Sequence, residues 1–359
     1  MKKALTIISA PLLLLFLGCS SYRTGYVTSD GFGQGSTYHI VYKIEGDSAQ
    51  ATREKVESLI PVWFEQINKS VSGYDSCSAI SRINRNETVV PDSIFIDIFN
   101  FAKEFYATSG GMLDAASAPL FDLWGFGFTE RDTVTSAGID SIRQFTGMDM
   151  FELHHDSTGY AIIKKDPRAK LNFNAVAQGY SCDYFAERME RLGITDYMIE
   201  IGGEIFCKGV NAKGGKWRIG IDKPIDGNLV PGEYLQSVLE VSGKGVVTSG
   251  NYRKFYIEDG KKYSHTIDPV TGMPVRHNLL SATVIAENAM LADAYATYFM
   301  VLGVEKSKDV LKKTPGIEAM LIYGDNENME VYMTDGFRNA ASDGSKTLSE
   351  GAKRQNDAR

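Results

Sequence analysis

Residues 264–274 read Ser264-His265-Thr266-Ile267-Asp268-Pro269-Val270-Thr271-Gly272-Met273-Pro274, and residues 292–297 read Ala292-Asp293-Ala294-Tyr295-Ala296-Thr297. The first stretch joins a histidine and an aspartate to a rigid turn, because Pro fixes φ and Gly reaches conformations that other residues avoid. On a helix, Asp293 and Thr297 of the second stretch would share one face. A base, hard oxygen ligands and a stiff loop together indicate metal-assisted phosphoryl chemistry.

The overall composition is that of a globular protein. The chain has 359 residues, of which 43% are hydrophobic and 23% are charged, which is enough material for one large domain or two smaller ones. A net charge of −7, without long runs of Lys or Arg, argues against nucleic acid as the main partner. Cys77, Cys182 and Cys207 fit neither a disulfide framework nor a zinc site, so we expect them to be buried.

The amino terminus has the pattern of an export signal. Lys2 and Lys3 precede an apolar run, 4–17, that is shorter than the roughly 20 residues of a membrane-spanning helix. The run ends in Leu15-Phe16-Leu17-Gly18-Cys19-Ser20, which resembles a bacterial lipobox. We therefore expect a signal peptide over 1–18, lipidation of Cys19 and a tether over 19–32, which together hold an exported protein at the periplasmic face of a membrane. The alternative is an ordinary signal peptide with an incidental cysteine, and the sequence leaves the choice of membrane open.

Hydrophobic periodicity and turn residues predict an α+β catalytic unit over 33–337, without regular βαβ alternation. A polar, disordered tail is expected over 338–359, and a loop over 248–252. Asp92 or Ser93 and Asn288 are the expected helix caps, and Pro61 is expected to kink or break the first helix. Helices are predicted at 49–69, 93–109, 180–193, 288–302 and 304–313. Strands are predicted at 37–44, 197–201, 205–207, 217–221, 235–241, 245–247, 253–257, 279–286, 317–323 and 328–333.

Two glycine-containing motifs have two interpretations each. The turn at Gly202-Gly203 is typical of a hairpin, but its backbone N–H groups could also approach a phosphate. The run Leu123-Trp124-Gly125-Phe126-Gly127-Phe128 is consistent with core packing, or with a wall for a flat ligand.

A histidine such as His265 is more often structural than catalytic.

The motifs in this order resemble the FAD:protein FMN transferases, the ApbE-type family, from about Gly35 to Gly303. The resemblance rests on Gly35-Ser36-Thr37-Tyr38, Tyr74-Asp75 with Ser78 and Ser81, Gly111-Met112-Leu113-Asp114, Pro119-Leu120, Trp124-Gly125-Phe126-Gly127, Ala175 to Gly179 with Asp183, Gly202-Gly203-Glu204, Trp217 with Ile219-Gly220-Ile221, Thr248-Ser249-Gly250 with Tyr252, Ser264-His265 with Ile267-Asp268-Pro269, Thr271-Gly272, and Ala292-Asp293-Ala294 with Thr297.

This resemblance implies a T-fold-like α+β architecture of mainly antiparallel sheets with packed helices. It also implies Mg²⁺-dependent transfer of FMN from FAD to a Thr or Ser hydroxyl of another protein, with release of AMP. Acceptors in the family include subunits of sodium-pumping quinone reductase and Rnf-type complexes, with a motif of the form Asp-Gly/Ala-x-Ser/Thr-Gly/Ala-Ala-Thr. Within this chain, Asp114-Ala115-Ala116-Ser117-Ala118 begins in a similar way, but Pro119 breaks the motif, so the acceptor is expected to be a separate protein.

The resemblance also assigns site residues. Asp293, the Thr297 hydroxyl and the Ala175 carbonyl would hold Mg²⁺; Asp293 and His265 would be catalytic, His265 as the general base. The residues expected to contact FAD are Gln34, Tyr74, Met112, Leu113, Asp114, Asn172, Gln178, Gly202, Gly203, Thr248 and His265. This chain departs from the usual family motif, because Asn172 replaces an Asp, Asn174 a Gly and Gln178 a Lys.

Two other functions remain open. An FAD pyrophosphatase would use the same metal site with water in place of the acceptor hydroxyl. A non-catalytic flavin-binding lipoprotein would need neither the metal nor the base, and the presence of Asp293, Thr297 and His265 argues against it.

Overall fold

The computed structural model describes residues 24–128, 133–157, 159–225, 234–251, 255–258, 261–325 and 328–342. The signal peptide, Cys19 and Tyr252 lie outside these ranges. Across the described parts of the chain, no helix combines the length and the apolar character needed to cross a bilayer.

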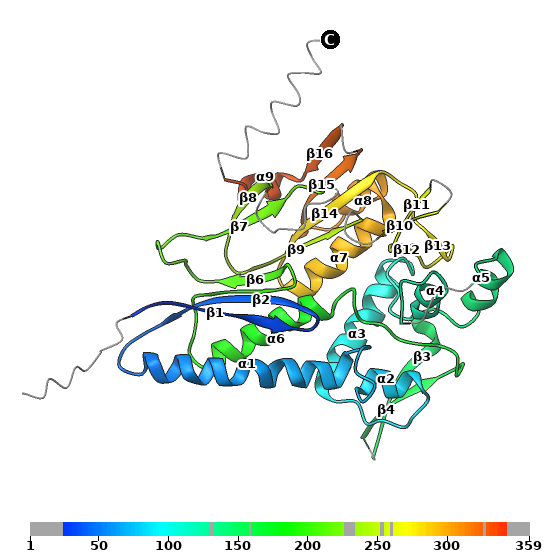
Figure 1. Ribbon diagram of the computed structural model, residues 1–359, viewed down its shortest axis with the longest axis horizontal. Helices are drawn as coiled ribbons and strands as arrows, with labels where there is room; N and C mark the ends of the chain where they lie inside the picture. Colours follow the sequence, from blue (N-terminus) through cyan, green and yellow to red (C-terminus); the bar gives the residue numbers. More distant parts are fainter. Residues whose placement is uncertain are drawn as a thin grey trace, which may run out of the picture.

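A large antiparallel sheet forms the centre of the molecule (Figure 1). Its eight strands are all antiparallel to their neighbours, as expected for the α+β class. In spatial order the strands are β1 (Gly25–Gly33), β2 (Ser36–Ile44), β5 (Tyr197–Ile201), β6 (Glu204–Lys208), β9 (Lys244–Gly250), β14 (Leu279–Ala286), β15 (Glu318–Gly324) and β16 (Met329–Met333).

Different elements cover the two faces of this sheet. One face packs on helices in the larger hydrophobic core, and the other packs on the β7–β8 hairpin and on α9 in a second core. The remaining paired strands are β3 (Phe151–Asp156) with β4 (Gly159–Lys164), β7 (Trp217–Asp222) with β8 (Leu235–Val241), β10 (Phe255–Glu258) with β11 (Lys261–Ser264), and β12 (Ile267–Asp268) with β13 (Met273–Pro274). The helices are α1 (Ala49–Val71), α2 (Ala79–Asn84), α3 (Ser93–Thr108), α4 (Ala118–Leu123), α5 (Ser136–Arg143), α6 (Ala177–Arg191), α7 (Ala289–Leu302), α8 (Val304–Leu311) and α9 (Asp335–Ala340).

The expected helix caps are present, but the expected break at Pro61 is wrong. The side chain of Asp92 accepts from the Phe95 amide at the start of α3, and that of Asn288 accepts from the Leu291 amide at the start of α7. Helix α1 continues through Pro61 for 23 residues. Glu57 and Pro61 are both exposed, so water can reach the carbonyl that Pro61 leaves without a donor.

The predicted tether and the predicted disordered tail are both too long. Residues 25–32, assigned to the tether, belong to β1, which pairs with β2 along its whole length. Two glycines make this pairing possible, because a Cβ at Gly31 would lie 2.4 Å from the Tyr38 hydroxyl and one at Gly33 would lie 2.7 Å from the Phe64 ring. At the other end, residues 338–342 are also ordered, since the Ser342 amide donates to the Val238 carbonyl at 2.8 Å.

Three further local expectations need correction. Residues 248–250, expected to be a loop, complete β9, where Thr248 pairs with Thr283 of β14. The short elements α4, α5 and the β3–β4 hairpin were missed. Cys182 and Cys207 are buried as expected, but Cys77 is exposed.

Candidate functional site

The site is centred on the crossing of α6 and α7, which approach each other closely at Gly179. A Cβ at Gly179 would lie 2.5 Å from the Ala289 carbonyl oxygen and 2.9 Å from Cβ of Asp293, so no larger residue fits there. The Gly179 amide donates to Asp293 Oδ2 at 3.2 Å. Gly179 is the third residue of α6 (Ala177–Arg191), so its amide is among those that the helix itself leaves without a partner. The Asp293 carboxylate supplies that partner from α7.

Asp183, one turn further along α6, fixes the start of α7. Its carboxylate accepts from the Ala289 amide at 2.8 Å and from the Met290 amide at 2.9 Å, both in the first turn of α7. A carboxylate at this position satisfies orphan amides and interacts favourably with the helix dipole. Burial raises the pKa of Asp183 to about 6, even though these two amides lower it. The contacts show that Asp183 holds the axial position of the helix that carries Asp293 and Thr297.

The surroundings of Asp293 fit a divalent cation. Its side chain is only 4% exposed, and burial raises its pKa well above the usual range, with a further contribution from the Asp183 carboxylate. A bound cation would supply the missing positive charge and favour the ionised form. No group of three or more His, Cys, Asp or Glu side chains gathers in the described residues. One carboxylate, a hydroxyl and a backbone carbonyl leave coordination positions for phosphate oxygens and water, as Mg²⁺ requires.

The strand β9 presents Ser249, and not Thr248, to this centre. Ser249 Oγ lies 3.4 Å from Thr297 Oγ1, whereas Thr248 Oγ1 lies 2.9 Å from the hydroxyl of Thr283. Adjacent strand residues point to opposite faces, so the Thr248 side chain faces the second core. Ser249 was not among the predicted site residues, because the direction of its side chain depends on strand β9 continuing through residue 249.

A second group of predicted FAD contacts meets above α6. Gln34, in the turn between β1 and β2, donates through Nε2 to Ser181 Oγ at 2.8 Å. The Gln178 side chain covers Gly202, where a Cβ would lie 2.3 Å from Gln178 Nε2. The structure thus brings Gln34, Gln178 and Gly202 together on the N-terminal half of α6, next to Gly179 and Asp293.

The amides of the Gly202-Gly203 turn already have partners. The Gly202 amide donates to the Thr37 carbonyl at 3.0 Å, and the Gly203 amide donates to Glu200 Oε1 at 2.8 Å. Both glycines have positive φ, at 67° and 101°. These contacts favour the hairpin interpretation over a phosphate cradle, and a role in FAD binding would rest on close backbone approach.

The loop that carries His265 is fixed by its own turn and by α4. Asp268 Oδ1 accepts from the Val270 amide at 2.8 Å and from the Thr271 amide at 3.2 Å, so this carboxylate builds the turn. Trp124 Nε1 donates to the Gly272 carbonyl at 2.8 Å. A Cβ at Gly272, whose φ is 71°, would lie 2.5 Å from the Ile139 side chain. The loop is therefore docked firmly on α4 and α5.

A short series of contacts links His265 to Thr297. The His265 ring meets the Phe126 ring edge-on at 6.5 Å. Its neighbour Thr266 donates to Asn251 Oδ1 at 2.6 Å. Asn251 directly follows the last residue of β9, Gly250, and lies two positions beyond Ser249, which contacts Thr297. His265 is thus held near the end of β9 that serves the Asp293 centre.

The segment around Asp114 lies beside Asn172. The Asn172 amide donates to the Ala115 carbonyl at 2.7 Å, and Asn172 Oδ1 accepts from the Asn174 amide at 2.9 Å. Asp114 is buried, and its carboxylate accepts from the Ala116 amide at 2.8 Å. Burial raises the pKa of Asp114 to about 7. Met112 and Leu113 are half-buried and pack against the larger core.

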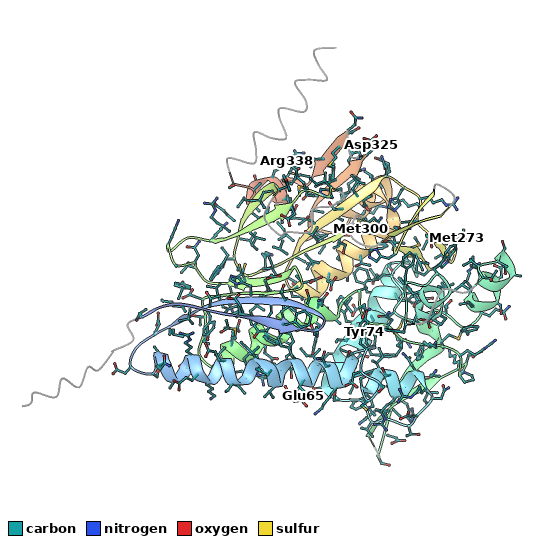
Figure 2. All side chains as sticks on the ribbon, in the orientation of Figure 1. Glu65, Tyr74, Met273, Met300, Asp325 and Arg338 are labelled. Atoms are coloured by element: carbon teal, nitrogen blue, oxygen red, sulfur yellow. The ribbon has the colours of Figure 1, made fainter. Side chains whose placement is uncertain are left out.

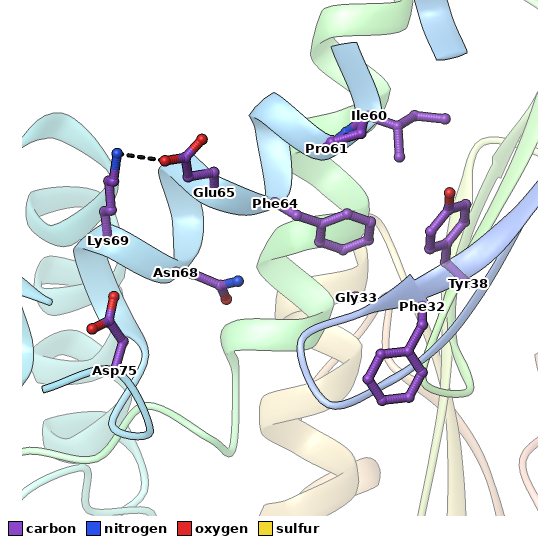
Figure 3. A pocket seen from close by; sticks show the side chains of 10 residues that line it. All are labelled: Phe32, Gly33, Tyr38, Ile60, Pro61, Phe64, Glu65, Asn68, Lys69 and Asp75. Atoms are coloured by element: carbon purple, nitrogen blue, oxygen red, sulfur yellow. Dashed lines mark ion pairs between the residues drawn. The ribbon is translucent and has the colours of Figure 1, made fainter. Parts of the chain in front are cut away.

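A cavity of about 420 Å³ lies between the tip of the β1–β2 hairpin and the second half of α1 (Figure 3). Gly33 and Asp75, which line it, are the chain neighbours of Gln34 and Tyr74. None of Asp293, Thr297 and His265 lines this cavity, so it borders the candidate site without containing the proposed chemistry.

The sequence of the chain is similar to one protein family over most of its length. The profile of the ApbE family matches residues 34–321. This chain belongs to the ApbE family. The FAD:protein FMN transferase of Salmonella typhimurium is 33% identical over 313 residues, which is 85% of this chain and 87% of the relative. The protein of the same name from Haemophilus influenzae is 33% identical over 333 residues, covering 91% and 95% of the two chains.

Solved ApbE structures share the fold. The flavin transferase ApbE from Vibrio cholerae superimposes with a TM-score of 0.74 at 30% identity, covering 88% of this chain and 99% of that one. The apo flavinyl transferase ApbE from Pseudomonas stutzeri gives a TM-score of 0.76 at 30% identity, covering 89% and 98%. Membership confirms the α+β fold and the transferase class predicted from the motifs. The roles of individual site residues remain predictions, including those of Asp183, Ser249 and Asn251, to which the sequence assigned no role in the site.

Proposed function

We propose that this chain is a Mg²⁺-dependent enzyme that transfers FMN from FAD to a Thr or Ser hydroxyl of a separate acceptor protein and releases AMP. The relatives named FAD:protein FMN transferases support this proposal. The observation that carries it is the buried Asp293 carboxylate, which accepts from the Gly179 amide and stands on a helix whose Thr297 hydroxyl meets Ser249. A buried acid without an opposing charge is suited to a metal and a pyrophosphate.

Asp293, the Thr297 hydroxyl and the Ala175 carbonyl would hold the metal ion, whose chemistry is to neutralise the charge on the pyrophosphate of FAD. Gln34 and Gln178 are placed to contact the dinucleotide, together with Gly202. Because Gln178 and Asn172 are uncharged, their contribution would be hydrogen bonding and orientation, without charge neutralisation.

His265 is the proposed general base. An imidazole nitrogen takes the proton of the acceptor hydroxyl as the hydroxyl oxygen forms a bond to the FMN phosphorus. The bond between that phosphorus and the bridging oxygen breaks, and AMP leaves with the bridging oxygen. The docked loop of residues 264–274 would hold the base in place during this step.

The acceptor is proposed to be another protein, with subunits of Rnf-type or sodium-pumping quinone reductase complexes as the candidates. Ser117 of this chain is 3% exposed, and its hydroxyl donates to the Asp114 carbonyl, so self-modification at the motif-like segment is disfavoured. The lipobox-like sequence supports an exported enzyme, anchored through Cys19 at the periplasmic face of a membrane.

The test is to incubate the protein with FAD, Mg²⁺ and a fragment that carries the acceptor motif, and to follow flavin fluorescence on the denatured fragment together with AMP. A fragment with Ala at the acceptor position is the control. We expect labelled fragment and AMP in equal amounts, and neither when Mg²⁺ is chelated. AMP without label would instead identify an FAD pyrophosphatase, and no AMP at all would reject both enzyme functions.

A further inference from the structure

The cavity between the tip of the β1–β2 hairpin and α1 adjoins the predicted FAD contacts but is lined by other residues (Figure 3). Figure 2 locates this region by Glu65, on α1, and by Tyr74, in the loop that follows α1. The volume of about 420 Å³ falls within the range of about 300–1,000 Å³ that is typical of ligand pockets. The cavity is therefore large enough for a ligand of its own.

Aromatic side chains form the inner wall of the cavity, and the core supports them. Phe64 of α1 is 6% exposed, and its ring packs on the Phe185 ring of α6 with centroids 4.8 Å apart. The Tyr38 ring of β2 meets the Phe64 ring at 5.3 Å. A Cβ at Gly33 would lie 2.7 Å from the Phe64 ring, so the hairpin tip lies directly on this wall. Such a preorganised wall loses little conformational entropy when a ligand binds.

The hairpin side of the cavity is open to water. Phe32, which lines the cavity, is 74% exposed, although burial of an aromatic ring is a large source of stability. Its strand, β1, is the edge strand of the eight-stranded sheet, so no strand of that sheet covers its outer side in the described parts of the chain. An extended polypeptide could therefore lie along this edge and cover the Phe32 ring.

The polar groups of the cavity suit a polypeptide better than a dinucleotide. Asn68 is half-buried, its side chain points from α1 toward the hairpin (Figure 3), and its amide makes no hydrogen bond to another described residue. A side-chain amide both donates and accepts, as a peptide backbone requires. Glu65 and Asp75 carry negative charge against the single positive charge of Lys69, which pairs with Glu65. A net negative charge disfavours the phosphates of FAD.

We propose that this cavity is a docking site for an extended segment of the acceptor protein that flanks the modified hydroxyl. A large apolar side chain of the segment packs on Phe32 and Phe64, and backbone groups of the segment pair with Asn68. The inference rests on the proposed function, which requires a protein substrate beside bound FAD. Docking here brings the acceptor next to the predicted FAD contacts Gln34 and Tyr74.

The test is a binding titration of an acceptor fragment that carries the motif with its natural flanking residues and a far-red dye. Fluorescence anisotropy is measured on FAD-loaded enzyme in EDTA, so that no turnover occurs. F32A should weaken fragment binding about tenfold, F32L should weaken it less, and N68A should weaken it a few-fold. FAD affinity, from flavin fluorescence, and melting temperature should stay at the wild-type values.

Y234A is the matched control. Tyr234 is an aromatic residue of 49% exposure directly before β8, and the β7–β8 hairpin covers the opposite face of the sheet. The proposal is overturned if wild type does not bind the fragment, if F32A and N68A bind it normally, or if Y234A weakens binding equally. Loss of FAD affinity in F32A would show that the cavity binds the dinucleotide, and a wild-type dimer that F32A dissociates would show that it binds a second copy. Failure of the proposed function gives a different result, namely wild type that binds the fragment but does not label it when Mg²⁺ is added.

Discussion

The α6–α7 crossing and the aromatic edge formed by Tyr74 and Phe128 differ in how much water can reach them. At the crossing, Gly179 and Asp293 are buried and Asp183 is half-buried, and contacts to backbone amides fix the two helices against each other. At the edge, Tyr74 and Phe128 stand on loops and remain open to water. The proposed metal centre is therefore built into the core, where solvent is excluded, whereas the predicted FAD contact at Tyr74 is left accessible.

The largest effect is expected at Asp293. D293N should reduce product formation at least about a hundredfold, because the remaining hydroxyl and carbonyl cannot neutralise the pyrophosphate. Mg²⁺ should raise the melting temperature of wild type but not of D293N. Since burial raises the pKa of Asp293, Mg²⁺ competes with a proton for the carboxylate, so the shift should grow with pH. D309N, at an exposed acid on α8, is the control, and a normal Mg²⁺ response in D293N would contradict the assignment.

A glycine substitution tests how tightly the crossing is built. G179A should destabilise the fold by about 1–3 kcal/mol, because its Cβ would meet backbone atoms of α7 that cannot move independently. Urea unfolding without Mg²⁺ measures this cost. Gly215, where the nearest atom to a Cβ is 3.9 Å away, provides the control variant G215A, expected within about 0.5 kcal/mol of wild type. Equal stabilities for the two variants would show that the helices can separate freely.

The pH dependence of the free energy of unfolding tests whether Asp114 is buried, like Asp293 at the crossing, or open to water, like Tyr74 at the aromatic edge. Burial raises its pKa from 3.8 to about 7, so between these values the folded state keeps a proton that the unfolded state has lost. Wild type should therefore lose stability relative to D114N as pH rises from about 4 to about 7, by up to about 4 kcal/mol. Urea unfolding across this range measures the difference. A constant difference would mean that the carboxylate of Asp114 has the same pKa in the folded and unfolded states.

The smallest effects should distinguish two neighbours on β9. S249A removes the hydroxyl beside Thr297 and should raise the Mg²⁺ concentration needed for half-maximal activity a few-fold, with little change in stability. T248A should have the opposite profile, with normal Mg²⁺ dependence and a loss of about 1 kcal/mol, because the buried Thr283 loses its partner. Activity titrations and urea unfolding of both variants provide the comparison, and identical behaviour would refute the assignment of strand faces.

The sequence predicted those features whose signals are local. Strands 197–201, 235–241 and 279–286 were predicted to the residue, because their hydrophobic patterns end at turn or cap residues. Strand β1 was missed because its pairing depends on glycines that fit under aromatic rings from elsewhere in the chain. Helices α4 and α5, with 6 and 8 residues, are too short to show a helical period.

The same limit applies to the site. Asp293 and Thr297 share a helix, so their joint direction could be predicted from spacing alone. The role of Asp183 depends on amides 106 and 107 positions away, and Ser249 depends on the length of its strand. The family motifs supplied the remaining predicted site residues.

The start of β1 at Gly25 has a consequence for access to substrates. With Cys19 as a lipid anchor, residues 20–24 alone connect the bilayer to the sheet, and five extended residues span at most about 18 Å. Such a short connection would keep the catalytic unit beside the lipid headgroups and restrict its rotation. An acceptor hydroxyl would then have to be presented at nearly fixed height, which favours acceptors that are themselves held at the same membrane surface.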